Sequence, residues 1–483
     1  MANVLNGLNP SLVFKYFEEI SQIPRGSGDE QRISDYLYNF GKELNLEVIQ
    51  DDYLNVIIRK PATAGYENCP GVILQGHMDM VCEKNKDVDH DFENDPIELR
   101  IVDDMIYANG TTLGADNGIA VAMGLAILAS NDLAHPALEV LITSNEEAGM
   151  TGANGLDGSI FQGKYIINLD SEEEGYLLVS CAGGNRAYVT LPLEYKAVEE
   201  NKETLLVEVK GLLGGHSGMD IIKQRANSNV TMGRILNSLG VNFDLVEVNG
   251  GSKNNAIPRE CEAKIVVNKY EVETLKANLA NIEAILKNEF RSTDSGLQVI
   301  VSESTTDKVL TEECKSKALL LLNLIPNGIQ TMSMDIEGLV ESSTNLGVVI
   351  TSNDTMSFES AVRSSVATLR ESINIKTKLV ADYVGAKVEI TDGYPAWEYA
   401  KDSKLEQLCI DVYEKLTGKK PIITSIHAGL DCGLLLDKMP GCEAISMGPN
   451  MYEVHTPNEH VSIPSIKNVW DYLVKVLESM NQY

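Results

Sequence analysis

The sequence lacks any long apolar run and any basic stretch at its start. None of its 483 residues lies in a run near the ~20 apolar residues that a membrane-spanning helix needs. The opening residues, Met-Ala-Asn-Val-Leu-Asn-Gly-Leu, do not have the basic region and apolar core of a secretory signal. We therefore expect no membrane partner and no export signal.

Basic residues are scarce as well. The chain has 40 Lys and Arg against 70 Asp and Glu, a formal net charge of −30 at pH 7. Such a charge repels phosphate groups and anionic lipids, so neither a nucleic acid nor an anionic membrane surface is expected as a partner. The charge does not identify a substrate, because a solvated acidic surface is a common reason for such a balance.

The eight cysteines show no CxxC spacing. A chain of this length can form a core large enough to be stable without disulfide bonds, so we expect reduced thiols and a cytoplasmic location. Cys82 lies near the first motif described below and is an alternative metal ligand. The carboxylates near it in the sequence make that role the less favoured one.

Residues 71–80 contain the first chemical signal. Val72, Ile73 and Leu74 form a short apolar run, the pattern of a buried strand in a parallel sheet. His77 and Asp79 follow two residues apart, so their side chains project to the same side of an extended segment. The carboxyl ends of strands are where open α/β sheets bind their ligands.

Acidic residues follow two further apolar strands and precede one apolar helix. Strands are expected at Glu139–Thr143 and Tyr165–Leu169, and a helix at Ile119–Leu128. The alternation of strand and helix predicts an α/β fold with a mostly parallel sheet. The acidic residues at these ends are Asp116, Glu146, Glu147 and Asp170.

The pattern changes at about residue 185, where alternating strands and a Gly-rich turn at 214–218 begin. We predict an α/β domain in two pieces, 1–184 and 392–483, with an inserted α+β domain at 185–391. A similar order of strands and helices recurs within the insertion, which suggests two related halves.

Five nitrogen or oxygen donors are expected at strand ends or loops of the α/β domain, and they suit zinc or a similar divalent ion. Five ligands exceed what one tetrahedral zinc takes, so two ions with a bridging carboxylate fit better. Glu146 is then free to act as a general base, and Asp79 to orient His77. The five donors are His77, Asp116, Glu147, Asp170 and His455.

These residues lie in motifs that run through nearly the whole chain. The sequence resembles the M20 family of di-zinc metallopeptidases, and within it the aminoacyl-histidine (cytosol non-specific) dipeptidases. Each motif alone would be a weak signal, but their joint occurrence in the family's order is specific. The matching segments are Gly76–Asp79, Gly114–Gly118, Asn145–Gly149, Leu169-Asp170, Gly215–Gly218, Asn255–Pro258 and His455–Pro457.

The resemblance implies an assignment for each candidate ligand. It implies His77 and Asp170 on one zinc, Glu147 and His455 on the other, and Asp116 as the bridge. Cobalt or manganese in place of zinc stays open. Glu146 would be the general base, and Asp79 the carboxylate that orients His77.

The resemblance also implies that 1–184 and 392–483 form the catalytic domain and that the inserted domain, 185–391, is the family's lid domain. His216 would stabilise the oxyanion of the tetrahedral intermediate, and Arg363 would bind the C-terminal carboxylate of the substrate. Asn255 would be a further substrate contact. For His427, in the Gly-rich segment 427–433, a substrate contact and a structural role remain equally open.

Each assignment has a structural alternative. His77 could be a core histidine, and Asp116 could cap the helix that follows it. Glu146 and Glu147 could be a solvated pair, and Arg363 a surface ion-pair partner. His460 competes with His455 as the last ligand, although the family's His-Thr-Pro order favours His455.

Together these features predict a metal-dependent dipeptidase that hydrolyses short unblocked peptides, such as β-Ala-His, by a metal-activated water with Glu146 as general base. The alternatives are an M20 amidohydrolase or deacylase, a tripeptidase, and a non-catalytic metal-binding protein. The expected partner is a small peptide. A homodimer is compatible with the sequence, which does not decide between monomer and dimer or whether His216 acts within its own chain.

Overall fold

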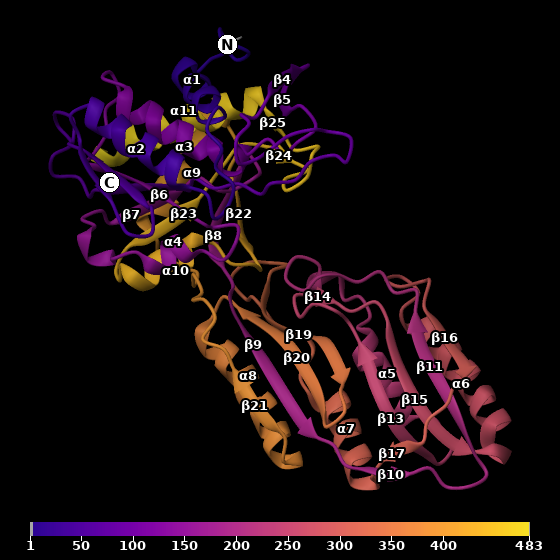
Figure 1. Cartoon of the computed structure of the whole chain (residues 1–483). Coiled ribbons are helices and arrows are strands. Elements are labelled where there is room, and N and C mark those ends of the chain that lie inside the picture. The colour runs from indigo at the N-terminus through magenta and orange to yellow at the C-terminus, as the bar shows by residue number, and fades with distance from the viewer. Residues whose placement is uncertain (1–2, 483) are drawn as a thin grey trace. The chain divides into compact units, whose positions relative to one another are not determined.

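The computed structural model describes residues 3–482, which divide into two compact units (Figure 1). The first unit runs to Ser180 and resumes with Tyr399–Ser425 and from Leu430 onward, whereas the second comprises Cys181–Glu398 and Ile426–Gly429. The domain boundaries expected from the sequence, 184/185 and 391/392, stay a prediction. Among the described residues, no helix combines the length and apolar character needed to cross a membrane.

An eight-stranded sheet forms the centre of the first unit. The four middle strands run parallel, as the α/β prediction required, whereas β1, β2 and β8 run antiparallel to their neighbours. The predicted fold class is therefore confirmed, with a sheet that is mixed towards its edges. In spatial order the strands are β1 (Glu47–Gln50), β2 (Val56–Lys60), β6 (Leu138–Thr143), β3 (Val72–His77), β7 (Tyr165–Asn168), β23 (Glu443–Ser446), β8 (Tyr176–Cys181) and β22 (Ile422–Ile426).

Seven α-helices belong to the described part of the first unit. Helix α3 is buried almost all round because it packs against both β3 and α1. From Ile119 to Leu128 the helix has no charged residue, which this position explains, since a helix face packed all round would leave a charge buried. The helices are α1 (Ser11–Ile20), α2 (Gln31–Glu43), α3 (Ala115–Ala129), α4 (Thr151–Gly155), α9 (Lys404–Thr417), α10 (Asp431–Lys438) and α11 (Ile463–Ser479).

A smaller sheet of four strands lies in the same unit. Its order is β24 (Met451–Tyr452), β25 (His460–Ser462), β5 (Met105–Ala108) and β4 (Leu99–Val102). His455 lies in the loop between β24 and β25, which pair antiparallel. The hairpin therefore anchors the loop that carries the last predicted ligand.

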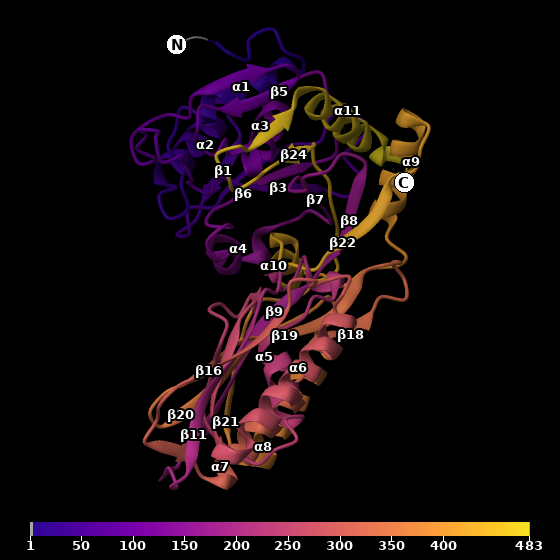
Figure 2. The same ribbon diagram turned by 90° about the vertical axis from the view of Figure 1, so that its right-hand side faces the viewer.

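The second unit is built on a nine-stranded sheet. Helices α5 to α8 pack on one face of it and share one apolar core with its strands (Figure 2). The helices are α5 (Ser228–Asn237), α6 (Val272–Glu289), α7 (Glu312–Leu324) and α8 (Ala367–Val384). The strands are β16 (Gln298–Glu303), β11 (Lys202–Lys210), β15 (Cys261–Asn268), β13 (Phe243–Gly250), β19 (Val340–Thr351), β20 (Thr355–Ser364), β9 (Gly183–Pro192) and β21 (Lys387–Ile390), with β18 (Gly328–Met332) beside β19.

The nine-stranded sheet of the second unit contains two smaller βαββαβ units, an inner one nested within an outer one. The inner unit is contiguous, β11-α5-β13-β15-α6-β16, and its strands lie in the order 16-11-15-13. The outer unit begins with β9 and continues only after the inner one, with α7, β19, β20, α8 and β21, in the order 19-20-9-21. Strand β13 of the inner unit pairs with strand β19 of the outer unit. The short strands β10 (Tyr195–Ala197) and β17 (Lys308–Leu310) flank the inner unit in sequence and pair with each other.

Candidate metal centre

Three strands of the first unit end at the same edge of the sheet. His77 is the last residue of β3 and lies opposite Thr143, the last residue of β6, while Gln75 lies opposite Asn168, the last residue of β7. Because these strands are parallel, the residues that follow them emerge side by side. Glu146, Glu147 and Asp170 follow β6 and β7 within four residues.

Two groups of potential metal ligands share Asp116. Nε2 of His77 lies 3.2 Å from Oδ1 of Asp116 and 3.5 Å from Oδ1 of Asp170. On the other side, Nε2 of His455 lies 3.1 Å from Oδ2 of Asp116 and 2.9 Å from Oε1 of Glu147. The structure thus brings together all five predicted ligands, with Asp116 offering one oxygen to each group.

The donor chemistry fits two divalent cations. Imidazole nitrogens and carboxylate oxygens are ligands of zinc and of similar ions. Burial raises the pKa of Asp170 to about 7, and the carboxylates of Asp116 and Glu147 raise the pKa of His455 to about 11. Both pKa shifts arise because several carboxylates lie close together and are largely shielded from water. Bound cations would neutralise this excess of negative charge.

Asp79 connects the first ligand to the segment that carries two acids. Its Oδ1 accepts a hydrogen bond from Glu146 N–H at 2.9 Å and lies 3.4 Å from Nδ1 of His77. Its Oδ2 accepts from Glu147 N–H at 3.2 Å and from the Ser27 hydroxyl at 2.7 Å. Asp79 is fully buried, yet its pKa is lowered, since the contacts with His77, Ser27 and Glu146 outweigh the effect of burial. It is placed to hold the His77 ring and the glutamate backbone together.

Glu146 lies in a tight loop beside these ligands. Asn145, which precedes it, has φ 54°, a left-handed conformation that asparagine tolerates better than most residues. Burial and the charges of Asp431, Asp170 and Glu147 raise the pKa of Glu146 well above its usual range, against the opposing effect of His77. A raised pKa suits a carboxylate that must accept a proton and then release it.

The loop that presents Asp116 is held by residues that the sequence reasoning missed. Glu459 is 2% exposed, and its carboxylate accepts hydrogen bonds from four successive backbone N–H groups, those of residues 113–116, at 2.7 to 3.3 Å. Buried Arg25 donates to the carbonyl of Gly114 at 2.5 Å and to that of Met78 at 2.9 Å. Gly114 has φ 68°, and a Cβ there would collide with the Arg25 guanidinium. The two oxygens of the Asp116 side chain contact Nε2 of His77 and Nε2 of His455, which supports a ligand role over the capping alternative.

The two alternative ligands lie in other surroundings. His460 stacks between the rings of Tyr107 and Tyr452, with centroids 4.5 and 5.0 Å away, and its Nδ1 contacts the carbonyl oxygen of Asn458 at 2.8 Å. Cys82 is exposed. Neither belongs to a ligand group found among residues 3–482.

Two candidate substrate residues of the second unit lie together on a small ribbon. Strand β12 (Gly215–His216) pairs with β14 (Ala256–Ile257), and Ser217 N–H donates to the carbonyl of Asn255 at 2.9 Å. Nδ1 of His216 accepts from the backbone N–H groups of Gly218 and Met219, at 3.3 and 3.1 Å. In the neutral ring the proton therefore sits on Nε2, which becomes a hydrogen-bond donor. Burial and the charge of Arg363 lower the pKa of His216 and favour this neutral form.

Arg363 and His427 lie close to His216 within the same unit. Arg363, on β20, donates from Nη1 to the hydroxyl of Tyr394 at 2.8 Å, while its buried Nε has no hydrogen-bond partner among the described residues. His427 is 7% exposed, and its Nε2 lies 2.7 Å from the Ser343 hydroxyl. Burial and the charges of Arg363 and His216 lower the pKa of His427 to about 3, so it is neutral at pH 7.

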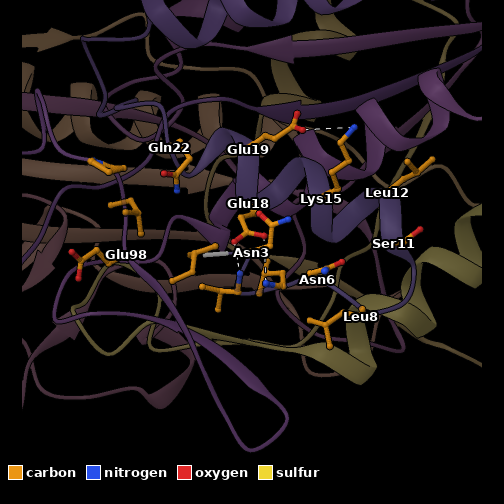
Figure 3. A pocket seen from close by; sticks show the side chains of 16 residues that line it. Asn3, Asn6, Leu8, Ser11, Leu12, Lys15, Glu18, Glu19, Gln22 and Glu98 are labelled. Atoms are coloured by element: carbon orange, nitrogen blue, oxygen red, sulfur yellow. Dashed lines mark hydrogen bonds and ion pairs between the residues drawn. The ribbon is translucent and has the colours of Figure 1, made fainter. Parts of the chain in front are cut away.

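A hollow of about 750 Å³ lies elsewhere in the first unit (Figure 3). It is lined by residues 3–8, one side of α1 and residues 96–99, and the Lys15–Glu19 ion pair borders it. None of the candidate catalytic or metal-binding residues lines it. We therefore place the chemistry at the shared edge of the strands rather than in this hollow.

Comparison with known proteins identifies the family. The model of peptidase family M20/M25/M40 matches residues 73–479, which include all five candidate ligands. The chain belongs to this family. It is therefore a peptidase, a hydrolase, as the motifs predicted.

Two relatives match over nearly the full length. The chain is 38% identical to the cytosol non-specific dipeptidase of Escherichia coli strain K12, over 99% of each chain. It is also 38% identical to the aminoacylhistidine dipeptidase of Vibrio alginolyticus, whose crystal structure matches with a TM-score of 0.94 over 98% of each chain. The aminopeptidase PepT of Bacillus cereus shares the fold, at 17% identity and a TM-score of 0.57 over 98% of this chain and 99% of its own.

Proposed function

We propose that this M20-family peptidase is a metal-dependent dipeptidase that cleaves short unblocked peptides, Xaa-His dipeptides such as β-Ala-His among them. The observation that carries the proposal is the pair of ligand groups sharing Asp116, with Glu146 beside them. The full-length similarity to two dipeptidases, one named for aminoacylhistidine substrates, supports the substrate class.

The proposed cofactor is a pair of zinc ions, with cobalt or manganese as alternatives. His77 and Asp170 would hold one ion, Glu147 and His455 the other, and Asp116 both. When bound, such ions polarise the scissile carbonyl and make a water molecule more acidic.

Glu146 would take the proton from the attacking water and deliver it to the nitrogen of the leaving amino acid. Asp79 would keep the His77 ring oriented and hold the backbone N–H groups of Glu146 and Glu147 in place. A protein that only binds metal would not need the carboxylates of Glu146 and Asp79 at these positions. Their presence disfavours the non-catalytic alternative.

Residues of the second unit would recognise the substrate. His216 can donate from Nε2 to the developing oxyanion, since its Nδ1 is occupied as an acceptor. Arg363, whose Nε is unpartnered in the part of the chain that the structure describes, would bind the substrate's carboxylate. Asn255 lies beside His216 on the ribbon and would be a further contact. The bond of His427 to Ser343 supports a role in fixing this region, and a direct substrate contact stays a prediction.

A cytoplasmic location is proposed from the absence of disulfide spacing in the sequence, and the name of the E. coli relative supports it. A small peptide is the proposed partner, and a homodimer remains compatible with the sequence.

The test is hydrolysis of β-Ala-His, Ala-His and N-acetyl-His, measured as released amino groups, with metal-stripped protein before and after addition of zinc. We expect zinc-dependent cleavage of the two dipeptides, lost in Glu146→Gln, which keeps the size of the side chain but cannot accept the proton. Cleavage of N-acetyl-His alone would instead assign the chain to the deacylases. Zinc binding without any cleavage would support the non-catalytic alternative.

A further inference from the structure

Asp431 is a buried acid that the proposed mechanism does not use. It is the first residue of α10 and is 1% exposed. Ionisable side chains are seldom fully buried without a charged partner or a function. No ion pair involving Asp431 is found among residues 3–482, and it belongs to neither ligand group.

One oxygen of Asp431 ties together the strands that carry the ligands. Its Oδ2 accepts a hydrogen bond from Gln75 Nε2 at 2.9 Å and from the Thr143 hydroxyl at 2.6 Å. Oε1 of Gln75 in turn accepts from Asn168 Nδ2 at 2.5 Å. The chain of bonds thus crosses β6, β3 and β7 just before Glu146, His77 and Asp170 respectively.

The other oxygen, Oδ1, is buried and has no hydrogen-bond partner within residues 3–482. An unpartnered carboxylate oxygen in the interior lowers stability, because the water it gave up is not replaced by a donor. Asp431 also lies near enough to His77, Asp79, Glu146 and Asp170 for its charge to act on them or theirs on it. The folded protein thus carries a buried acid with one unpartnered oxygen, close to the proposed cation ligands.

We infer that Asp431 is a positioning residue of the metal centre, which fixes the ends of β3 and β6 and whose charge strengthens the binding of divalent cations without ligating them. The inference rests on the proposed function, because it requires that the Asp116-centred groups bind metal. Bound cations would compensate the charge that is unfavourable in the metal-free protein. Asp431 therefore links metal binding to the stability of the sheet edge.

Asp431→Asn separates the charge from the hydrogen bonds. The amide oxygen of the asparagine can still accept hydrogen bonds from both Gln75 and Thr143. Its NH2 group takes the place of Oδ1, a position that no donor of the described residues faces. We expect zinc affinity, measured by competition with a chelating dye, to fall about tenfold or more. We also expect the metal-free variant to unfold at the same urea concentration as the wild type or at a higher one.

Two variants serve as controls. Asp437→Asn removes the same charge from an exposed position of the same helix, so zinc affinity should not change. Thr143→Val removes one of the bonds but keeps the charge, so it should lower the stability of the metal-free protein more than it weakens zinc binding. With saturating zinc, Asp431→Asn should regain most of the wild-type kcat on β-Ala-His, while the zinc concentration for half-maximal activity rises about tenfold.

Unchanged zinc affinity in Asp431→Asn would overturn the inference. So would a loss of affinity accompanied by an equal loss of stability in the metal-free protein, since that is the mark of a purely structural residue. If the wild type itself binds no zinc, the proposed function fails instead, and the two failures are distinguishable.

Discussion

Glu459→Gln should destabilise the protein far more than an ordinary change of Glu to Gln. The Glu459 carboxylate accepts four backbone hydrogen bonds, two on each oxygen: Leu113 and Gly114 donate to Oε2, Ala115 and Asp116 to Oε1. A glutamine keeps one oxygen, so its NH2 group would face two of the four N–H donors. Leaving a buried N–H without an acceptor costs about 1–3 kcal/mol, so the expected loss is about 4 kcal/mol for the two.

The assay is urea unfolding of the metal-free protein, with zinc titration as a second measurement. Because one of the donors is the backbone N–H of Asp116, the proposed bridging ligand should lose its fixed position and zinc affinity should fall as well. Glu453→Gln in the same segment is the matched control, since Glu453 is exposed and should change stability by less than about 0.5 kcal/mol. A loss below about 1 kcal/mol in Glu459→Gln would refute the reasoning, because it would show that the four bonds are replaceable.

Three further predictions follow from other contacts. Tyr394→Phe removes the acceptor of the Arg363 Nη1 hydrogen bond, so KM for Ala-His should rise several-fold while cleavage of its C-terminal amide is unaffected. The control is Tyr195→Phe, whose lost hydroxyl bonds to Ser352 and not to Arg363. An equal effect of Tyr394→Phe on both substrates would contradict the role of Arg363. His427 has a pKa of about 3 in the folded protein against about 6.5 when unfolded, so its contribution to stability is present above pH 6.5 and is lost as pH falls towards 3. Between pH 7.5 and pH 5 the wild type should therefore lose about 2 kcal/mol that His427→Gln does not lose, and parallel urea profiles of the two proteins would exclude this. Removal of metal by a chelator should lower Tm, and zinc should restore it; a Tm that does not respond to zinc would argue against metal binding by the folded state.

The strand ends and their ligands could be predicted from the sequence because the signal is local. An apolar run such as Val72–Leu74 predicts a buried strand, and parallel pairing then brings the residues after each strand to one edge. The five candidate ligands were predicted in this way, together with the motifs, and the structure gathers them into two groups.

The residues that hold the site were missed because their role depends on distant partners. Glu459 acts on a loop that lies more than 340 residues earlier in the chain, and Asp431 on Gln75, which is 356 residues away. No sequence spacing indicates such pairs. The sequence offered one signal: each acid lies close to a motif that had been singled out. Glu459 follows His455-Thr-Pro, and Asp431 follows His427-Ala-Gly.

Helix α6 was missed although its signal was present. Its buried residues Val272, Leu275, Leu279 and Leu286 recur at helical spacing, but charged residues between them obscure the pattern. The nested arrangement of the second unit could not be predicted, because which strand lies beside which depends on the packing of the whole sheet.

The nesting has a consequence for the order in which the second unit can form. All strands and helices of the inner unit come from one continuous stretch, Lys202 to Glu303, so its contacts can form as soon as that stretch is synthesised. Strand β9, by contrast, pairs with β20, and Gly183 lies opposite Ser364. The first strand of the outer unit must therefore wait for more than 160 further residues before its neighbour exists, while the inner unit and the β10–β17 pair bring the two separated parts near each other.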